Sequence, residues 1–417
     1  MKTLGHDYGH ALLAATRLLL RASNTARADD LPSLVRLAGY EFGASFALIY
    51  VVDYDQVQLL PLLEGDPQTE GALLMAREAL PVEGTIAGRC FTDVSVTSSA
   101  GAMRSGAGIS IWAPLLDGTD RLGVLELVFD DEIDVDEALD TDLKLLAALI
   151  AELVMSRTLI GDFIERTRRR LPMLLESELQ WKLLPPLTFM SPRVSIAGVL
   201  APTHEVAGDS FDYAVNGDIA HLCIVDAMGH GLDATLMSAV ATGALRNARR
   251  SGLNLVDTTR SMNKHLAAQF GGSKFVTAII GELDTRTGVW TWVNAGHPAA
   301  LVVRRGRVVK TLDSIINPPL GLQHEAPEVG EERLEPGDRL LLYTDGVIEA
   351  RDDEGDFFGI SRLVDLVSRE GASPRPAAET LRRLNLAILA HQEGLLQDDA
   401  TTLLVEWSSA DARRVTP

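Results

Sequence analysis

The alternation of apolar and polar residues in the first 160 positions predicts a mixed region of helices and strands. Residues 11–30 and 31–42 have the apolar spacing of amphipathic helices, and residues 143–160 form a strongly apolar helix. Short apolar or alternating runs predict strands at 47–53, 57–63, 109–116 and 122–129. The last two runs are separated by the turn at 117–120, so we expect them to pair as a hairpin.

A different pattern begins near residue 194 and continues almost to the end of the chain. Strands are expected at 194–201, 219–226, 275–283, 288–294, 299–304, 338–344 and 400–407. Helices are expected at 231–251, 257–269, 359–370 and 376–392. Antiparallel hairpins alternating with pairs of helices predict an α+β layered fold, and not a Rossmann fold or a barrel.

The segment between these regions is charged and partly amphipathic. Its apolar residues recur at near-helical spacing, and Pro172 is expected to kink or break the helix. They are Leu159, Phe163, Leu171, Leu174, Leu175, Leu179 and Leu183. A linker helix packed on its own domain and a dimerising signalling helix both agree with this pattern. The expected organisation is an N-terminal helix (1–26), a first domain (27–157), a linker (158–190), a second domain (191–408) and a tail (409–417).

Length and composition narrow the classes of protein. A chain of 417 residues is too long for one ordinary core, and a formal charge of −20 disfavours nucleic acid as a partner. Two cysteines, far apart in the sequence, exclude a disulfide framework and fit a reducing compartment. The longest apolar stretch, 143–155, contains Lys144 and Glu152 and is too short for a membrane span. The N-terminus reads as an amphipathic helix and not as an export signal, so we expect a cytoplasmic protein with no membrane partner.

Acidic residues at the ends of apolar strands are the candidate chemistry. Asp226 and Asp345 each end a long apolar strand beside a small residue, while Asp209 and the pair Asp398–Asp399 lie in similar turns. Singly, each is more simply explained as a solvated turn residue. Together, they match the need of two divalent ions for several hard carboxylate oxygens and a backbone carbonyl. Oxygen ligands favour Mn²⁺ or Mg²⁺ over zinc.

The histidines in turns are weaker candidates. His230 and His297 have spacing that supports neither a zinc site nor a catalytic triad. For His297, a hydrogen bond that stabilises the turn is the simpler interpretation and a functional role is the alternative.

Seven motifs occur in one order over some 230 residues: LLPP (183–186), EVAGDSFDY (205–213), VDAMGHGLDA (225–234), VNAGHPAALV (293–302), PPLGL (318–322), LYTDGVIEA (342–350) and DDATTLLV (398–405). Residues 179–407 therefore resemble the PPM superfamily of metal-dependent protein phosphatases, in its sporulation-protein-E/stress-response branch. The resemblance implies an α-β-β-α layered sandwich for the second domain.

The resemblance also implies roles for individual residues. Asp226 would bridge both metals, the Ala227 carbonyl would bind one of them, and Asp209 would hold the first metal directly or through water. Asp345 and Asp398 would hold the second metal. Asp398 is favoured over Asp399 because the family motif is Asp followed by Asp or Asn. Asp226 and Asp209 would be the catalytic residues.

Three departures from the family pattern are visible. The family commonly has Gly-Gly-Asp-Phe-Tyr-Asp where this chain has AGDSFD (207–212), and Val or Gly where this chain has Ala227. Neither removes a carboxylate. The branch also lacks the arginine with which other PPM phosphatases bind phosphate, and the sequence nominates no replacement.

The N-terminal hairpin carries a second resemblance. Residues 114–127, PLLDGTDRLGVLEL, followed by an apolar helix, resemble the end of a GAF domain, a small α+β sensor module. Such modules host varied ligands or none. We expect Cys90 to be a buried structural thiol, the alternative being a cofactor attachment point.

By resemblance, the chain is expected to be a serine/threonine protein phosphatase with two bound Mn²⁺ or Mg²⁺ ions. Its substrate would be a phosphorylated anti-sigma-factor antagonist of a bacterial partner-switching pathway, hydrolysed without a covalent enzyme intermediate. The first domain and the linker would control activity, and a homodimer through the linker is possible. The alternatives are a catalytically silent phosphoprotein-binding module of the same fold and a hydrolase of small phosphate esters.

Overall fold

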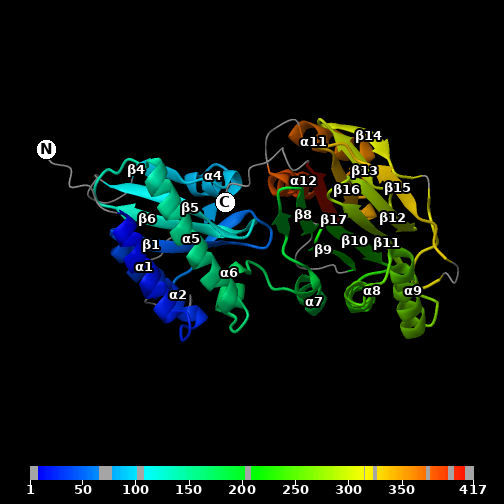
Figure 1. Ribbon diagram of the computed structural model, residues 1–417, viewed down its shortest axis with the longest axis horizontal. Helices are drawn as coiled ribbons and strands as arrows, with labels where there is room; N and C mark the ends of the chain where they lie inside the picture. Colours follow the sequence, from blue (N-terminus) through cyan, green and yellow to red (C-terminus); the bar gives the residue numbers. More distant parts are fainter. Residues whose placement is uncertain are drawn as a thin grey trace. The chain divides into compact units, whose positions relative to one another are not determined.

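The computed structural model describes residues 8–64, 78–100, 108–201, 208–313, 315–322, 326–371, 376–392 and 399–408. The chain divides into two compact units, Met1–Leu171 and Pro172–Pro417. The boundary between the units lies inside the segment 158–190 that was expected to be a linker. Figure 1 shows the elements of each unit.

The N-terminal unit is built around one antiparallel sheet. Its strands follow the order β3-β2-β1-β6-β5-β4. They are β1 (Phe46–Val52), β2 (Gln58–Pro61), β3 (Leu80–Pro81), β4 (Thr97–Ala100), β5 (Ile109–Asp117) and β6 (Asp120–Phe129). The helices are α1 (Tyr8–Ala22), η1 (Ala28–Asp30), α2 (Leu31–Phe42), α4 (Ile86–Asp93), α5 (Glu137–Thr158) and α6 (Phe163–Arg168).

Both faces of this sheet are covered, and the residues of β1 show why. Ile49 and Val51 pack into the core that α1, α2 and α5 share with the sheet. Tyr50 and Val52 point to the opposite face and pack with Cys90 of α4. Successive strand residues face opposite sides, so a continuous apolar run predicts a strand buried twice. Cys90 is buried and its pKa is raised by burial, in agreement with a structural thiol.

The C-terminal unit contains two antiparallel sheets. One has the order β15-β12-β11-β10-β9 and the other β14-β13-β16-β17-β8-β7. The strands are β7 (Thr188–Met190), β8 (Val194–Ala201), β9 (Asp209–Asn216), β10 (Ile219–Ala227), β11 (Val276–Asp284), β12 (Val289–Ala295), β13 (Leu301–Arg304), β14 (Arg307–Thr311), β15 (Gly330–Arg333), β16 (Arg339–Tyr343) and β17 (Ala400–Trp407). The helices are α7 (Leu175–Leu183), α8 (Leu232–Arg250), α9 (Leu255–Phe270), α10 (Asp345–Ile348), α11 (Gly359–Gly371) and α12 (Ala377–His391).

Three core clusters give this unit its layers. Leu222 and Ile224 of β10 face the other sheet, whereas Cys223 and Val225 face α8 and α9. A third cluster joins the second sheet to α11 and α12. The order helix, sheet, sheet, helix is visible in Figure 1, with α11 and α12 on one side and α8 and α9 on the other.

Close approach between the two sheets requires a glycine at one point. A side-chain carbon on Gly198 of β8 would collide with the ring of Phe211 of β9. This contact packs β9 against β8. Strand β8 is paired along its length with β17, so β9 also lies near β17.

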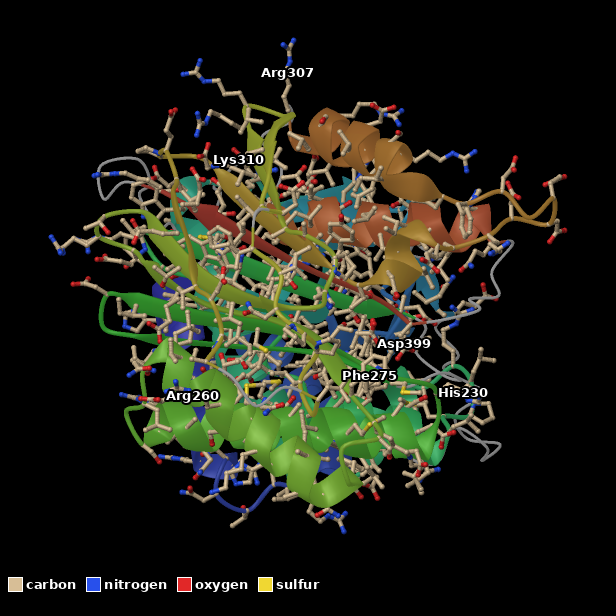
Figure 2. All side chains as sticks on the ribbon, turned by 90° about the vertical axis from the view of Figure 1, so that its right-hand side faces the viewer. His230, Arg260, Phe275, Arg307, Lys310 and Asp399 are labelled. Carbon is tan, nitrogen blue, oxygen red and sulfur yellow. The ribbon has the colours of Figure 1, made fainter. Side chains whose placement is uncertain are left out.

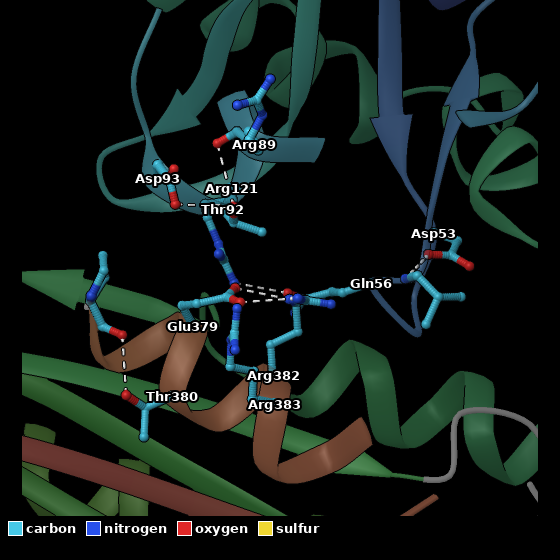
Figure 3. A network of polar contacts seen from close by, with 12 residues as sticks. Asp53, Gln56, Arg89, Thr92, Asp93, Arg121, Glu379, Thr380, Arg382 and Arg383 are labelled. Carbon is cyan, nitrogen blue, oxygen red and sulfur yellow. Dashed lines mark hydrogen bonds and ion pairs between the residues drawn. The ribbon is translucent and has the colours of Figure 1, made fainter. Parts of the chain in front are cut away.

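Ion pairing within α12 adds local stability on the second sheet's helical side. The Nε atoms of Arg382 and Arg383 donate to the two oxygens of Glu379, at 2.9 Å each (Figure 3). These pairs span one helical turn, which is the spacing at which side chains on a helix meet.

Most predicted elements of both halves are confirmed within a few residues, including the hairpin of β5 and β6. The first helix ends at Ala22 and not at residue 30, and the Arg157 guanidinium donates to the carbonyls of Ser23 and Ala26 just beyond this end. The helix expected from residue 143 begins at Glu137, where Asp136 caps the Leu139 N–H. Pro172 lies in the break between α6 and α7, as predicted.

Strand β9 was not predicted. Its sequence, DSFDYAVN, reads as an acidic turn because aspartate is rare in strands. It forms a strand because its backbone pairs antiparallel with β10 along its whole length, although its composition does not favour a strand. None of the helices in the described parts of the chain has both the length and the apolarity of a membrane span.

Candidate functional site

Two of the predicted aspartates face each other across neighbouring strands. Asp209 is the first residue of β9, and the strand register places it directly opposite Asp226 near the end of β10. Asp209 is 3% exposed, while Asp226 is half-buried. Directly opposed residues have Cβ atoms about 5 Å apart, so two like charges here destabilise the pairing unless something offsets them.

A third carboxylate comes from the other sheet. Asp399 precedes β17 and is 3% exposed, and its Oδ2 accepts the Asp209 backbone N–H at 3.0 Å. The residue that the sequence favoured, Asp398, lies outside the described residues. Asp399 therefore joins the site as a partner of the Asp209 backbone, a role that the motif alone did not indicate.

The environment of Asp209 disfavours its charged form. Burial raises the pKa of Asp209 well above its usual range, and the neighbouring carboxylates of Asp399 and Asp226 raise it further. The hydroxyl of Thr344 opposes the shift by donating to Asp209 Oδ2 at 2.6 Å. A group in this position gains from binding either a proton or a cation.

Asp345 approaches the same place from β16. It begins the one-turn helix α10 directly after Thr344, and it is half-buried. A side-chain carbon on Gly346 would collide with the Asp399 carbonyl, so the chain after Asp345 lies against Asp399. The glycine next to Asp345 is thus required by close packing.

The Ala227 carbonyl also borders this site. Ala227 N donates to the Gly208 carbonyl at 3.3 Å, and a side-chain carbon on Gly208 would lie 3.3 Å from Ala227 O. The Ser238 hydroxyl of α8 donates to the same Gly208 carbonyl. Gly208 thereby keeps the space beside the Ala227 carbonyl free of side-chain atoms.

The oxygen atoms at this site are of the kind that bind a hard divalent cation. The site offers carboxylate and carbonyl oxygens, and the pKa of Asp209 is raised by burial and by the carboxylates of Asp399 and Asp226. Among the residues that the structure describes, no three carboxylate, imidazole or thiol groups already converge on one point as a metal site.

Gln180 is a site residue that the sequence did not indicate. It lies on α7, is 1% exposed, and its Nε2 donates to the Asp209 carbonyl at 2.7 Å and to Asp399 Oδ2 at 3.1 Å. On the same helix Leu175 and Leu179 are exposed. Apolar residues of a helix are usually assigned to its buried face, so the sequence did not predict this contact. The one sequence signal was that Ser177 and Gln180, which are both buried, lie one helical turn apart.

His297 is structural in this arrangement. Its Nε2–H donates to the Tyr343 carbonyl at 3.0 Å, and its Nδ1 accepts from the Thr277 hydroxyl at 2.8 Å. Burial lowers the pKa of His297 to about 3, so the ring is neutral. Thr277 pairs with Asp226 and Tyr343 precedes Thr344 and Asp345, so His297 ties together the two strand ends that carry the acids. His230, by contrast, is exposed in the glycine-rich turn after β10.

Figure 2 shows the C-terminal unit with the side chains drawn. Asp399, Phe275 and His230 are labelled toward one side of this view, while Arg260 lies well apart from them, on the helical side.

Comparison with known proteins places this arrangement in context. Residues 216–408 match the family model described as stage II sporulation protein E (SpoIIE). The chain is 22% identical over 214 residues to phosphoserine phosphatase RsbU of Bacillus subtilis. The aligned region covers 51% of this chain and 63% of RsbU. It is 30% identical over 165 residues to phosphoserine phosphatase RsbP of the same organism, covering 38% and 40%.

Among solved structures, the SiaA-PP2C domain of Pseudomonas aeruginosa aligns with 56% of this chain and 94% of that domain, at 21% identity and a TM-score of 0.48. The matched part of this chain spans less than two thirds of the length of either curated relative. The region from residue 216 to 408, which carries Asp226, Asp345 and Asp399, is therefore similar to the SpoIIE family, whose model it matches.

Proposed function

We propose that the C-terminal unit is a metal-dependent phosphatase acting on phosphoserine or phosphothreonine of a protein. The observation that carries this proposal is the buried Asp209, which lies beside Asp226 and Asp399 and whose pKa is raised first by burial and then by both carboxylates. A metal-dependent hydrolase needs carboxylates that are not paired with cationic side chains, because the bound metal ions supply the balancing positive charge.

Five groups would hold the ions. They are the carboxylates of Asp209, Asp226, Asp345 and Asp398 and the carbonyl of Ala227. Asp399 already accepts two hydrogen bonds at Oδ2, which supports a role in orienting Asp209 and leaves Asp398 as the proposed ligand. Two Mn²⁺ or Mg²⁺ ions, when bound, would activate water and neutralise the phosphoryl oxygens.

The chain's own residues would prepare this site. Thr344 fixes one oxygen of Asp209, and Gln180 together with Asp399 fixes its backbone. His297 holds the strand ends in place without carrying charge. No side-chain nucleophile is required, so attack of water on phosphorus needs no covalent enzyme intermediate.

The names of the relatives suggest a substrate class. RsbU and RsbP are phosphoserine phosphatases, so an anti-sigma-factor antagonist carrying phosphoserine is the proposed substrate. The N-terminal unit, proposed as GAF-like from its hairpin and closing helix, would regulate this activity. Gln180 supports that idea, because it lies in the segment expected to link the two domains and contacts the acidic site directly.

A homodimer through the same segment is also proposed. Leu159, Leu171 and Leu175 are 85%, 57% and 61% exposed, which is unusual for leucine. Sedimentation velocity on the full chain tests this: a monomer at micromolar concentration contradicts it.

The proposed activity is tested by p-nitrophenyl phosphate hydrolysis with Mn²⁺, comparing wild type, Asp226→Asn and an EDTA control. We expect metal-dependent turnover that Asp226→Asn lowers roughly a hundredfold or more, because one bridging carboxylate is lost. Asp257→Asn, at an exposed position of α9, is the matched control and should retain full activity. Turnover that persists in EDTA or in Asp226→Asn contradicts the proposal.

A further inference from the structure

An acidic site repels the phosphate dianion that it is proposed to cleave. The ions offset part of this charge, but phosphate sites commonly include a cationic side chain as well. The sequence nominates none. Lys274, in the turn between α9 and β11, has the position and the environment for this role.

The backbone of Lys274 lies beside the segment that follows Asp226. After α9 ends at Phe270, two successive glycines, Gly271 and Gly272, adopt positive φ of 68° and 70° and turn the chain back. Phe275 O then accepts the Met228 N–H at 3.2 Å, and Val276 pairs with Ala227. Lys274 therefore stands just beyond the end of β10, next to the turn that carries Met228 and His230.

The same backbone is held from the other side by a tight turn. Val276 and Leu320 exchange two backbone hydrogen bonds of 3.0 and 2.9 Å. A side-chain carbon on Gly321 would lie 2.7 Å from the Lys274 carbonyl, and Gly321 N donates to Asn263 Oδ1 at 2.7 Å. The main chain at Lys274 is thus fixed, while its side chain is 38% exposed.

The ammonium group of Lys274 has an exchangeable partner. Its Nζ lies 2.6 Å from Asp233 Oδ2, in the first turn of α8, and Asp233 is 76% exposed. Ion pairs of this exposure contribute little to stability, so a phosphate oxygen can replace the carboxylate at small cost. Asp233 would hold the ammonium in place until an anion arrives.

We propose that Lys274 binds the phosphoryl group of the substrate, exchanging the Asp233 carboxylate for a phosphate oxygen. This proposal rests on the proposed phosphatase function and names the residue that supplies the missing cation. Lysine serves here as a point charge at the edge of the acidic site, and Asp233 competes with the substrate for it.

The test uses the full chain with Mn²⁺ and measures KM for p-nitrophenyl phosphate and Ki for inorganic phosphate. We expect Lys274→Met to raise both about tenfold, as for loss of one charged hydrogen bond. Lys274→Arg should stay within about threefold of wild type, because it keeps the charge. Asp233→Asn should lower Ki a few-fold, since it removes the competitor.

A second ion pair provides the matched control. Arg260 and Asp257 of α9 lie 3.1 Å apart with 53% and 45% exposure, and Arg260 is well separated from Phe275 in Figure 2. Arg260→Met should leave KM and Ki unchanged. KM and Ki values for Lys274→Met that stay within twofold of wild type overturn the proposal. A rise in Ki for Asp233→Asn equal to that for Lys274→Met also overturns it, because it indicates that the ion pair is structural.

Failure of the proposed function is distinguishable from failure of this inference. If wild type hydrolyses nothing with Mn²⁺, calorimetric titration with inorganic phosphate decides the role of Lys274. Phosphate binding that wild type shows and Lys274→Met loses supports the inference, whereas equal binding, or none in either protein, overturns it.

Discussion

Strand β9 carries two buried aspartates, three residues apart, in opposite electrostatic surroundings. Asp212 faces the helical layer, where its oxygens accept from Arg246 at 2.7 and 2.9 Å and from Arg249 at 2.8 Å. Asp209 faces the other sheet and meets Asp399 and Asp226. Both are 3% exposed, so burial does not separate their roles.

The comparison shows how partners decide the role of a buried carboxylate. Two guanidinium groups satisfy Asp212 and tie β9 to α8, which is a structural function. The hydroxyls of Thr344 and Thr401 oppose the rise in the pKa of Asp209 only in part, and two further carboxylates lie nearby. A buried carboxylate with other carboxylates nearby is stabilised in its charged form by a bound cation.

The largest expected change in the free energy of unfolding comes from replacing Asp212, the aspartate of β9 that is paired with arginines. Asp212→Asn leaves Arg246 and Arg249 without their shared carboxylate, and removing one partner of a buried pair costs about 3–5 kcal/mol. Urea unfolding monitored by circular dichroism measures the loss. A loss below about 1 kcal/mol would contradict the structural role of Asp212.

Gln180→Leu is expected to have the next largest effect. It removes a donor from the Asp399 carboxylate and from the Asp209 carbonyl, both buried, and should lower the free energy of unfolding by about 1–3 kcal/mol. Ser177→Ala, one turn earlier on α7, is the control. The Ser177 hydroxyl finds no hydrogen-bond partner among the described residues, so this variant should be as stable as wild type or slightly more stable.

Asp209→Asn should have a small effect of opposite sign on the metal-free protein. Removing one of several mutually repelling charges is expected to raise the free energy of unfolding in EDTA by about 1 kcal/mol. The same variant should lose Mn²⁺-dependent hydrolysis. Destabilisation as large as that of Asp212→Asn would show that the two carboxylates do not differ as described.

The smallest expected effect concerns His297 and pH. Its pKa in the folded protein is about 3, below its ordinary value of about 6.5, so the unfolded chain binds an extra proton between these values. Stability from this residue is therefore present above pH 6.5 and is lost as pH falls, by about 0.7 kcal/mol between pH 7 and 6. His297→Gln should remove this part of the pH dependence, and an unchanged pH dependence in the variant would contradict it.

The sequence predicted the layered C-terminal fold because its strands and helices carry strong periodic patterns. In β10, apolar residues occupy both faces, as expected of a strand buried between a sheet and helices. Asp226 and Asp345 were recognised because an acid at the end of such a strand stands out. Strand β9 was missed because its polar composition disfavours a strand on local grounds.

By itself, the sequence determined which residues could supply hard oxygen ligands and that they lie at strand ends. Only the tertiary structure decided that Asp209 stands opposite Asp226, that Asp399 binds the Asp209 backbone, and that Gln180 reaches both from α7. The physical reason is that periodicity and turn chemistry are local, whereas these contacts join residues up to 219 positions apart. Such contacts depend on strand register and on how the layers pack, which no local pattern records.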